Sequence, residues 1–537
     1  MMHRKRKSYT RRDFLRMLGA VGGSSAVWTA TRAWGLMTPT MQEPPPLQGN
    51  ANGRRIIIIG AGLGGMTAAY ELMQRGYEVQ ILEAQERAGG RNWSVRQGTE
   101  VAEIGGETQV CNFDEGHYAN LGPWRIPYHH TSVLYYCRLF NVPLEFFVNY
   151  HESAFVYVEG DHGPLSGRPI RVRELNSDMR GYTSELLAKC AQEGNLDGEL
   201  APENVEQLLD YLSDYAHLED DYSFTGYNSG GYRTDPGALD QPGEDRTPYP
   251  LEDLLPYAAE IMGEQASYLG AVVGYDYQMP MFQPVGGMDQ IGRAFAHILE
   301  DRITYMAEVN EIRQNTDGVR IVYRDRGTNE THEATGDYCI CNVPLPVLLN
   351  IAGDFSNEMR QAMRGVTYEP TGKMGIQFSR RFWETDEQIY GGSTRTNIPE
   401  IGDISYPNYG FFGQKGVLQA YYNFQRPAIR VSNLTPQERI ELALEHGSKI
   451  HPQYRQFYEN GISVSWHRMP YALGGWAVYN DFTREQYYPT LIEPDGRIYL
   501  VGEHLSYLTG WMAGAIESAW KQIEKLHTRV MQNQGGA

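Results

Sequence analysis

The sequence predicts an α/β fold that begins with a β-α-β unit, and three observations support this prediction. Residues 56–59 are four consecutive isoleucines, which is typical of a strand buried on both faces. The pattern G-x-G-x-x-G follows at Gly60, Gly62 and Gly65, where glycines permit a tight turn, close approach of the backbone to a phosphate and close helix packing. A second strand ends at Glu83, whose carboxylate is placed to accept hydrogen bonds from ribose hydroxyls. Together these features predict a dinucleotide-binding unit.

The residues between and after these strands refine the prediction. Small and apolar residues recur at helical spacing behind the glycines, and Gly76 is placed to end that helix. The segment from Glu86 to Arg91 reads E-R-A-G-G-R and resembles the R-x-G-G-R continuation of flavoproteins of the amine oxidase and glutathione reductase type. Two glycines flanked by arginines suit a diphosphate, because the backbone approaches closely and a guanidinium binds two oxygens. The resemblance therefore implies FAD rather than NAD.

Composition limits the classes of function. The chain has 537 residues and a formal net charge of −19, which argues against a nucleic-acid partner. The five cysteines are scattered, odd in number and without a C-x-x-C pair, so neither a disulfide framework nor a zinc site is predicted from them. Cys339 and Cys341 lie in an apolar strand pattern and are interpreted as small buried hydrophobic residues.

The N-terminus is basic and resembles a twin-arginine export signal. Eight basic residues and one acidic residue occur in residues 1–33, and Arg11-Arg12 precede a short apolar run. This run is too short and too rich in Gly and Ser for a transmembrane helix. We expect a signal region at 1–35, a proline-containing linker at 36–52, and a periplasmic or secreted protein without stable membrane insertion after export. Whether the signal is cleaved or retained as an anchor is left open.

A more specific resemblance begins at residues 118–127, which read Y-A-N-L-G-P-W-R-I-P. This segment resembles one found in FAD-dependent L-amino acid oxidases, members of the flavin-containing amine oxidase superfamily, and the following Y-H-H resembles their bacterial branch. The resemblance implies that Arg125 binds the substrate α-carboxylate. His129 and His130 stand at a predicted helix start, where a structural role is the simpler interpretation.

The resemblance also implies a domain organisation. It consists of a discontinuous FAD-binding domain of glutathione-reductase type, a mixed-sheet substrate domain and a helical insertion that covers the active-site entrance. We assign residues 53–100, 281–365 and 490–537 to the FAD-binding domain, 101–165 and 366–489 to the substrate domain, and 166–280 to the insertion. Strands are expected at 303–312, 319–323 and 338–342 and near 496–503, with a helix from residue 513 to about residue 526.

The predicted site has a cofactor-binding and a substrate-binding part. In the family, a valine at the position of Val309 contacts the adenine, and a carboxylate at the position of Glu503 bonds the ribityl chain. The predicted FAD-binding residues are Gly60, Gly62, Gly65, Glu83, Ala84, Gly90, Arg91, Gly122, Pro123, Trp124, Val309 and Glu503. The predicted substrate-binding residues are Arg125, Tyr421 and Gly510; no metal is expected. Tyr421 is selected among 37 tyrosines by its Ala-Tyr context alone.

Three residues are expected to be catalytic by the same resemblance. Lys373 aligns with the lysine that amine oxidases direct through a water at flavin N5, where its charge would assist reoxidation by oxygen. Trp476 and Trp511 occupy positions of aromatic rings that confine the reacting amine. For each of the three, the alternative is an ordinary surface or core residue.

The implied reaction is oxidative deamination of an L-α-amino acid, with hydride transfer from Cα to flavin N5. The products are a 2-oxo acid, ammonia and hydrogen peroxide, and the partners are the small-molecule amino acid and oxygen. An amine or polyamine oxidase and a flavin amino-acid 2-monooxygenase, which yields an amide, remain alternatives. A homodimer is compatible with the sequence, and the accepted side chain is left open.

Overall fold

The computed structural model describes residues 42–535, except residues 197, 227, 238–239 and 264–273. The predicted signal region and the first part of the linker lie outside these residues. No helix in the described part of the chain has both the length and the apolar character that a membrane-spanning helix requires.

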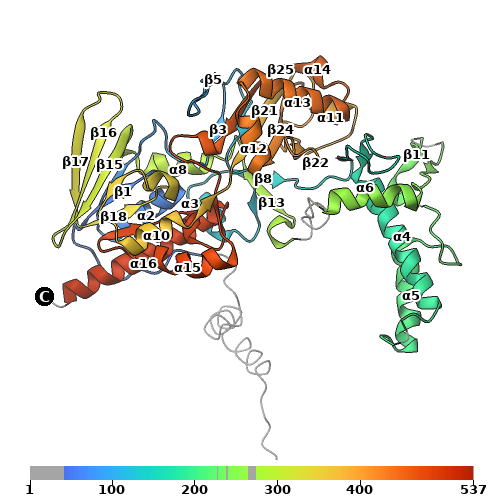
Figure 1. The fold of residues 1–537 in the computed structure, drawn as a ribbon, viewed down its shortest axis with the longest axis horizontal. Coiled ribbons are helices and arrows are strands. Elements are labelled where there is room, and N and C mark those ends of the chain that lie inside the picture. The colour runs from blue at the N-terminus through green and yellow to red at the C-terminus, as the bar shows by residue number, and fades with distance from the viewer. Residues whose placement is uncertain (1–41, 197, 227, 238–239, 264–273, 536–537) are drawn as a thin grey trace, which may run out of the picture.

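A five-stranded parallel sheet forms the centre of the dinucleotide-binding unit, in the order β14-β2-β1-β18-β27 (Figure 1). Its strands come from three separate parts of the chain. They are β1 (Arg55–Ile59), β2 (Glu78–Leu82), β14 (Ile303–Thr304), β18 (Tyr338–Cys341) and β27 (Ile498–Leu500). Both faces of the sheet are covered, as the isoleucine run predicts.

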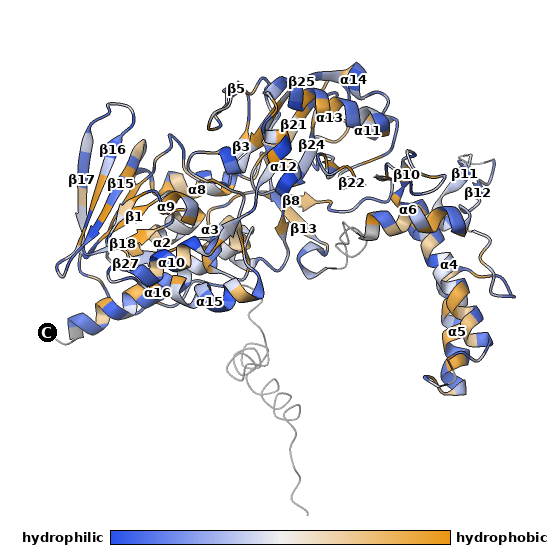
Figure 2. Ribbon diagram, in the orientation of Figure 1, coloured by the Kyte–Doolittle hydropathy of each residue, from blue (hydrophilic) through white to orange (hydrophobic). Residues whose placement is uncertain are grey.

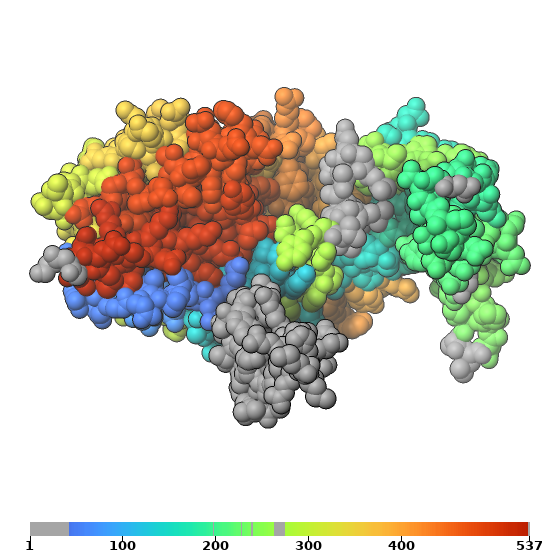
Figure 3. Space-filling model, turned by 90° about the horizontal axis from the view of Figure 1, so that it is seen from below, coloured from blue at the N-terminus to red at the C-terminus, as the bar shows by residue number. Residues whose placement is uncertain are grey.

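The two faces of β1 belong to different hydrophobic cores. Ile56 and Ile58 pack in the core that includes helices α2 (Leu63–Met73) and α16 (Met512–Gly535), whereas Ile57 packs with Cys339 in the core on the other face. The strands of this unit are strongly hydrophobic (Figure 2). Helix α16 packs on α2, and red C-terminal and blue N-terminal residues lie side by side in Figure 3. The C-terminus therefore completes the unit that the N-terminus begins.

The predicted strand at 303–312 is two strands. Between β14 and β15 (Ala307–Gln314), Met306 adopts a φ of +59°, and the chain turns there. As a result, β14 joins the parallel sheet, while β15 joins a separate four-stranded sheet of order β17-β16-β15-β19. The other strands of that sheet are β16 (Val319–Asp325), β17 (Thr331–Gly336) and β19 (Ala352–Gly353).

A seven-stranded mixed sheet forms the second unit, in the order β10-β9-β22-β23-β24-β21-β25. The β22–β9 pair is parallel and the other pairs are antiparallel. The strands are β9 (Phe155–Tyr157), β10 (Ile170–Arg171), β21 (Thr371–Phe378), β22 (Ser393–Thr396), β23 (Asp403–Ser405), β24 (Gly416–Phe424) and β25 (Tyr458–Ser465). Helices α12 (Gln425–Ser432) and α13 (Pro436–Ile450) pack on this sheet.

The helical segment that follows β10 in the chain extends away from the rest of the molecule (Figure 1). It contains α4 (Val172–Gln192), α5 (Pro202–Ala216) and α6 (Leu251–Gly263). Helices α4 and α5 pack on each other around a small core of their own. Strand β13 (Met281–Pro284), which follows this segment, pairs with β7 (Ile126–Pro127) and β8 (Leu144–Phe147).

The remaining elements are short or lie at the periphery. The strands are β3 (Ser94–Val95), β4 (Glu100–Val101), β5 (Gln109–Val110), β6 (Ala119–Asn120), β11 (Tyr232–Thr234), β12 (Glu244–Asp245), β20 (Thr367–Tyr368) and β26 (Ala477–Val478). The helices are α3 (Thr131–Leu139), α8 (Gln290–Ile298), α9 (Leu345–Leu348), α10 (Asn357–Arg364), α11 (Phe382–Thr385), α14 (Tyr454–Phe457) and α15 (Asp481–Leu491). The 3₁₀ helices are η1 (Asn228–Gly230), η2 (Tyr275–Tyr277), η3 (Glu300–Arg302), η4 (Trp466–Arg468) and η5 (Glu503–Leu505).

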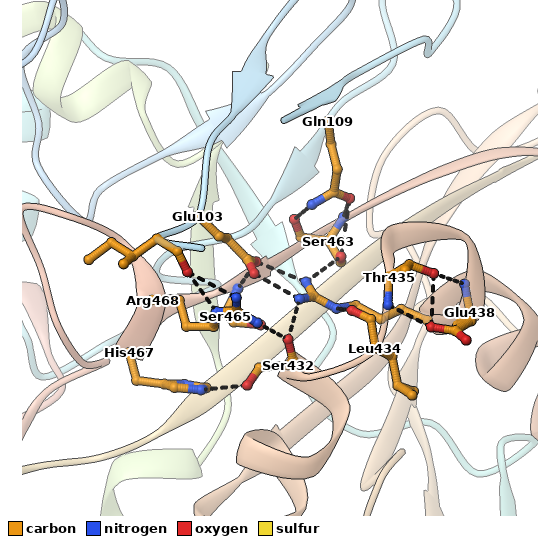
Figure 4. A network of polar contacts seen from close by, with 12 residues as sticks. Glu103, Gln109, Ser432, Leu434, Thr435, Glu438, Ser463, Ser465, His467 and Arg468 are labelled. Atoms are coloured by element: carbon orange, nitrogen blue, oxygen red, sulfur yellow. Dashed lines mark hydrogen bonds and ion pairs between the residues drawn. The ribbon is translucent and has the colours of Figure 1, made fainter. Parts of the chain in front are cut away.

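A buried ion pair connects Glu103, which lies just after β4, to Arg439 on helix α13. The Arg439 guanidinium donates to both carboxylate oxygens of Glu103, at 2.9 and 2.7 Å, and both side chains are 2% exposed. The Ser465 amide also donates to Glu103, at 2.7 Å, and Figure 4 shows the surrounding polar network. Each charge neutralises the other, so the removal of one would leave the other buried at a high cost in free energy.

We expect Glu103→Gln to destabilise the protein by about 3–5 kcal/mol, because it leaves the Arg439 charge buried without a counter-ion. Urea unfolding followed by circular dichroism measures the change. Glu441 lies on the same helix as Arg439 and pairs with Arg455 at the surface, at 3.1 Å. Glu441→Gln is therefore the matched control, and its unfolding midpoint should equal that of the parent. Equal midpoints for all three proteins would contradict the assignment.

Candidate functional site

A large cavity of about 730 Å³ extends from the five-stranded sheet to the seven-stranded sheet. Residues that follow the carboxyl ends of four parallel strands line one part of it: Gly60 after β1, Glu83 after β2, Asn342 after β18 and Gly502 after β27. Ligands of parallel α/β sheets bind at this edge, where strand ends and helix starts leave a crevice. Strands β21, β22, β23 and β24 contribute residues to the other part.

The glycine pattern forms a cradle that side chains would fill. Gly60 has a φ of +94°, and a Cβ on Gly62 would lie 2.6 Å from the Asn342 side-chain nitrogen. A Cβ on Gly65 would lie 2.2 Å from the Gly60 carbonyl oxygen, so Gly65 permits α2 to pack against β1. Gly60 and Gly62 line the cavity, whereas Gly65 supports it from behind.

Glu83 is held at the cavity wall by backbone amides. One carboxylate oxygen accepts a hydrogen bond from the Ala61 N–H at 2.7 Å, and the other accepts from the Gln85 N–H at 2.9 Å. Burial raises the pKa of Glu83, although these amides oppose the rise. The carboxylate is therefore fixed in position next to the glycine cradle.

The Glu503 carboxylate joins three distant segments. It accepts a hydrogen bond from Arg91 Nη1 at 2.9 Å and from the Gly510 N–H at 3.2 Å. The same Arg91 nitrogen donates to the Gly475 carbonyl oxygen at 2.7 Å. Arg91 and Glu503 thus neutralise each other at the cavity wall, beside the Trp476 loop and Gly510.

The remaining predicted cofactor residues line the same cavity. They are Ala84, Gly90, Gly122, Pro123, Trp124 and Val309. Arg87 of the E-R-A-G-G-R segment, which is not among the predicted site residues, also lines it. Burial lowers the pKa of Arg87 to about 10, and its guanidinium lies 4.3 Å from the centre of the Trp93 ring. An open glycine cradle, the fixed carboxylate of Glu83 and two partly buried arginines fit the expected dinucleotide.

Lys373 occupies the buried part of the cavity. Its side chain is 2% exposed, and its Nζ donates to the Gly122 carbonyl oxygen at 2.7 Å. Nζ also lies 4.2 Å from the centre of the Tyr422 ring. Burial, together with the nearby positive charge of Arg125, lowers the pKa of Lys373 to about 7. The alternative of a solvated surface lysine is therefore inconsistent with its position.

Arg125 also lines the cavity, close to two aromatic rings. Its guanidinium lies 5.2 Å from the centre of the Trp124 ring and 4.9 Å from that of Tyr277. Its Nε is buried without a hydrogen-bond partner, and no carboxylate among the described residues lies within ion-pair distance of it. Burial lowers the pKa of Arg125. A partly buried guanidinium of this kind has the chemistry to bind an anionic group of a ligand.

The expectation for Tyr421 requires correction by one residue. In the register of β21 and β24, Lys373 pairs with Tyr422, whereas Tyr421 pairs with Met374. Cross-strand partners share a face of the sheet, so Tyr422 faces the cavity with Lys373. Tyr421 instead packs in the hydrophobic core of the second unit and is fully buried. The Ala-Tyr context in the sequence did not reveal which of two adjacent tyrosines faces inward.

The sequence analysis missed a buried ion pair in the substrate-side wall. Arg395 on β22 pairs with Asp403 on β23, and both residues line the cavity. Burial raises the pKa of Asp403, while Arg395 and Arg125 oppose the rise. These residues lie in short strands without a recognisable motif. Their charge within an otherwise buried β-pattern is the one signal that marks them.

The two predicted tryptophans both line the cavity, and Gly510 lies beside one of them. Gly510 has a φ of +81°, and a Cβ there would lie 3.3 Å from Cγ of Trp476. The glycine thus lets the Trp476 ring approach the chain. Of the described part of the helical segment, Tyr277 is the residue that lines the cavity. The described residues of α4 and α5 do not line the cavity. That the insertion covers the entrance stays a prediction.

Comparisons with known proteins agree with this geometry. Residues 63–522 match the family described as flavin containing amine oxidoreductase. The chain is 29% identical to YobN of Bacillus subtilis over 488 residues, covering 88% of this chain and 94% of that protein. It is 28% identical to an L-amino-acid oxidase of Vipera ammodytes ammodytes over 486 residues, covering 88% and 92%.

Solved structures share the fold at lower identity. Putrescine oxidase bound to putrescine is 17% identical, with a TM-score of 0.58, and the match covers 89% of this chain and 99% of that one. Cyclohexylamine oxidase from Brevibacterium oxydans is 16% identical, with a TM-score of 0.58, and the match covers 89% and 100%. These similarities concern the fold.

Proposed function

This chain belongs to the flavin-containing amine oxidoreductase family, and on that premise we propose that it oxidatively deaminates an L-α-amino acid. The products of this reaction are a 2-oxo acid, ammonia and hydrogen peroxide. Arg125 is the observation that carries the proposal, because its partly buried guanidinium lines the cavity, with an unbonded Nε and no ion pair to a carboxylate of the described residues. A plain amine has no group that would satisfy this cation, whereas an α-carboxylate does.

The cofactor is FAD, and the glycine cradle, Glu83, Arg91 and Glu503 would hold it. When bound, FAD supplies the acceptor for the hydride from the substrate Cα and returns the electrons to oxygen. The protein residues bind and orient the substrate, exclude water and place charges in the cavity. No separate general base is required beyond the loss of a proton from the substrate ammonium group.

Arg125 and Tyr422 form the proposed carboxylate site. Both residues line the cavity, and the Arg125 charge opposes the rise in the pKa of Tyr422 that burial causes. The Tyr422 hydroxyl would donate to one carboxylate oxygen, and the guanidinium would bind the other or both. Gly510 would accept a hydrogen bond from the α-amine through its carbonyl, next to the Trp476 ring.

The proposed side-chain pocket contains the Arg395–Asp403 pair. An ion pair offers N–H donors and carboxylate oxygens in one wall, so a substrate side chain that reaches it meets a polar surface. Trp511 and Trp476 add apolar ring surface to the same cavity. This composition favours an amino acid whose side chain has an apolar stem and a polar end.

Export by the twin-arginine route is part of the proposal. The motif at Arg11 and Arg12, followed by the short apolar run, supports it. This route carries folded proteins, which suits an enzyme that takes up its flavin before it crosses the membrane. Peroxide is then produced outside the cytoplasm.

Arg125→Ala should lower kcat/KM for L-amino acids by about a hundred- to several-thousand-fold. The variant leaves the substrate carboxylate desolvated and unpaired, which costs about 3–5 kcal/mol. Steady-state peroxide release with each L-amino acid and its decarboxylated amine measures the effect. Arg125→Lys should restore activity in part, since an ammonium does not form two parallel hydrogen bonds.

The amines serve as an internal control for this experiment. They lack the carboxylate, so their kcat/KM should change little in Arg125→Ala, provided that the variant retains FAD and the parent melting temperature. Amino-acid turnover within a few-fold of the parent would refute the assignment. Turnover of amines alone by the parent would identify an amine oxidase, and an amide product would identify a monooxygenase.

Tyr422→Phe should lower kcat/KM for the best amino acid by about 10- to 150-fold, because it removes a hydrogen bond to a charged group worth about 1.5–3 kcal/mol. Tyr421→Phe is the matched control, since the neighbouring hydroxyl lies in the protein core outside the cavity. It should leave kcat/KM within about threefold of the parent. The reverse order of effects would restore the assignment to Tyr421.

Lys373→Met should slow reoxidation by oxygen at least tenfold, with flavin reduction by substrate changed about threefold or less. The ammonium form exists below the pKa of about 7 and is lost above it, so the parent's reoxidation rate should fall as the pH rises through 7. Stopped-flow absorbance of each half-reaction measures both rates. The control Lys415→Met removes a lysine paired with Glu459 outside the cavity. A pH dependence that persists in Lys373→Met would contradict this role.

A further inference from the structure

Two histidines and an aspartate form a cluster beside the cavity that the proposed reaction does not use. His129 and His130 lie between β7 and the start of α3, and Asp276 lies on the 3₁₀ helix η2. We refer to these residues as the His-His-Asp cluster. Among the described residues it is the one group of three potential metal ligands whose ligand atoms lie within 4.8 Å of one another.

One ring nitrogen of each histidine in this cluster, Nε2, is buried without a hydrogen bond. His130 is 2% exposed, and its Nε2 is buried without a hydrogen-bond partner. The His129 Nε2 is likewise buried without a hydrogen bond, and it lies 3.5 Å from the nearer Asp276 oxygen. Buried polar atoms are satisfied in nearly all native proteins, because an unsatisfied one costs free energy. The unbonded imidazole nitrogens can therefore donate their lone pairs to a cation.

Aromatic rings hold both imidazoles in place. The His129 ring is stacked on Tyr275, with 4.1 Å between ring centres, and the His130 ring stands edge-on to Trp511 at 4.8 Å. The Asp276 side chain is 41% exposed. The cluster thus combines two fixed nitrogen ligands with a carboxylate that faces solvent, and an ion has a path to it.

We propose that the His-His-Asp cluster binds a divalent transition-metal ion, with Zn²⁺ as the ion that fits best. Imidazole nitrogens and a carboxylate oxygen are the ligands that Zn²⁺ prefers, and three protein ligands leave a fourth position for water. Donor atoms about 2.0–2.2 Å from Zn²⁺ in a tetrahedral site lie roughly 3.3–3.6 Å apart. The 3.5 Å between His129 and Asp276 already meets this requirement, and the remaining ligand atoms, which lie within 4.8 Å of one another, need to approach by at most about 1.5 Å.

The position of the cluster connects it to the cavity. Tyr277 follows Asp276 in η2, lies 4.9 Å from the Arg125 guanidinium and 6.1 Å from Trp511, measured to ring centres. An ion bound by both histidines and Asp276 would hold η2 against the start of α3. It would thereby fix Tyr277 and Trp511, two residues of the cavity wall. We infer a structural metal at the edge of the substrate site rather than a catalytic one.

Isothermal titration of the FAD-loaded, untagged protein with ZnCl₂, after treatment with a chelator and dialysis, tests the proposal. We expect one equivalent of Zn²⁺ to bind and to raise the melting temperature, because an ion that binds only the native state stabilises it. MgCl₂ in the same titration should give no saturable binding, since Mg²⁺ prefers an all-oxygen site.

Two conservative variants identify the ligands. His129→Gln and Asp276→Asn should each weaken Zn²⁺ binding at least tenfold and abolish the rise in melting temperature. His332 is the matched control, because its Nε2 lies 3.8 Å from Glu330 at the surface and belongs to no three-ligand group among the described residues. His332→Gln should bind Zn²⁺ as the parent does.

The flavin spectrum and the metal-free melting temperature must match the parent in every variant, so that a loss of binding is not a loss of fold. The absence of saturable Zn²⁺ binding by the parent would overturn the proposal. Binding that persists unchanged in both ligand variants, or that is lost equally in His332→Gln, would also overturn it. Failure of the amino-acid oxidase assignment would leave this result unaffected, because the titration requires no turnover.

Discussion

The site depends on one buried carboxylate that collects parts of the chain far apart in sequence. Glu503 binds Arg91 from the first β-α-β unit and the Gly510 amide from the turn before the last helix. Arg91 in turn binds the Gly475 carbonyl from the second unit. The loss of this carboxylate would leave a partly buried guanidinium without its counter-ion and would release the loops that carry Trp476 and Gly510. Cofactor and substrate residues are therefore positioned by the same interaction.

The positive charges of the cavity are also mutually dependent. Arg125 lowers the pKa of Lys373, and burial lowers the pKa of both groups. In the proposed reaction a substrate carboxylate would neutralise Arg125 and thus weaken its repulsion of Lys373. Substrate binding would then favour the protonated lysine. The binding of a carboxylate to Arg125 would thus influence the protonation of Lys373. The sequence alone does not indicate this coupling.

The sequence predicted those parts of the structure that short-range pattern controls. The isoleucine run, the glycine pattern and Glu83 identified the β-α-β unit, because each residue type there follows from local backbone geometry. Tyr421 was misplaced because the choice between adjacent strand residues depends on cross-strand register, which no local pattern reveals. Arg395 and Asp403 were missed for the same reason, since their pairing joins two short strands. The strand at 303–312 was divided by a single left-handed residue, Met306.

The parallel sheet is assembled from the beginning, the middle and the end of the chain. Strand β27 and helix α16 lie in the last 40 residues. Helix α16 packs on α2, in the same hydrophobic core as one face of β1. During synthesis the N-terminal β-α-β unit therefore emerges long before the strand that completes its sheet. Its apolar faces stay unburied until the residues that pack on them have been made. The cradle at residues 60–65 and Glu503 come together only after residue 503 has left the ribosome. A chain that stops before β27 therefore lacks one strand of the parallel sheet and the carboxylate that binds Arg91.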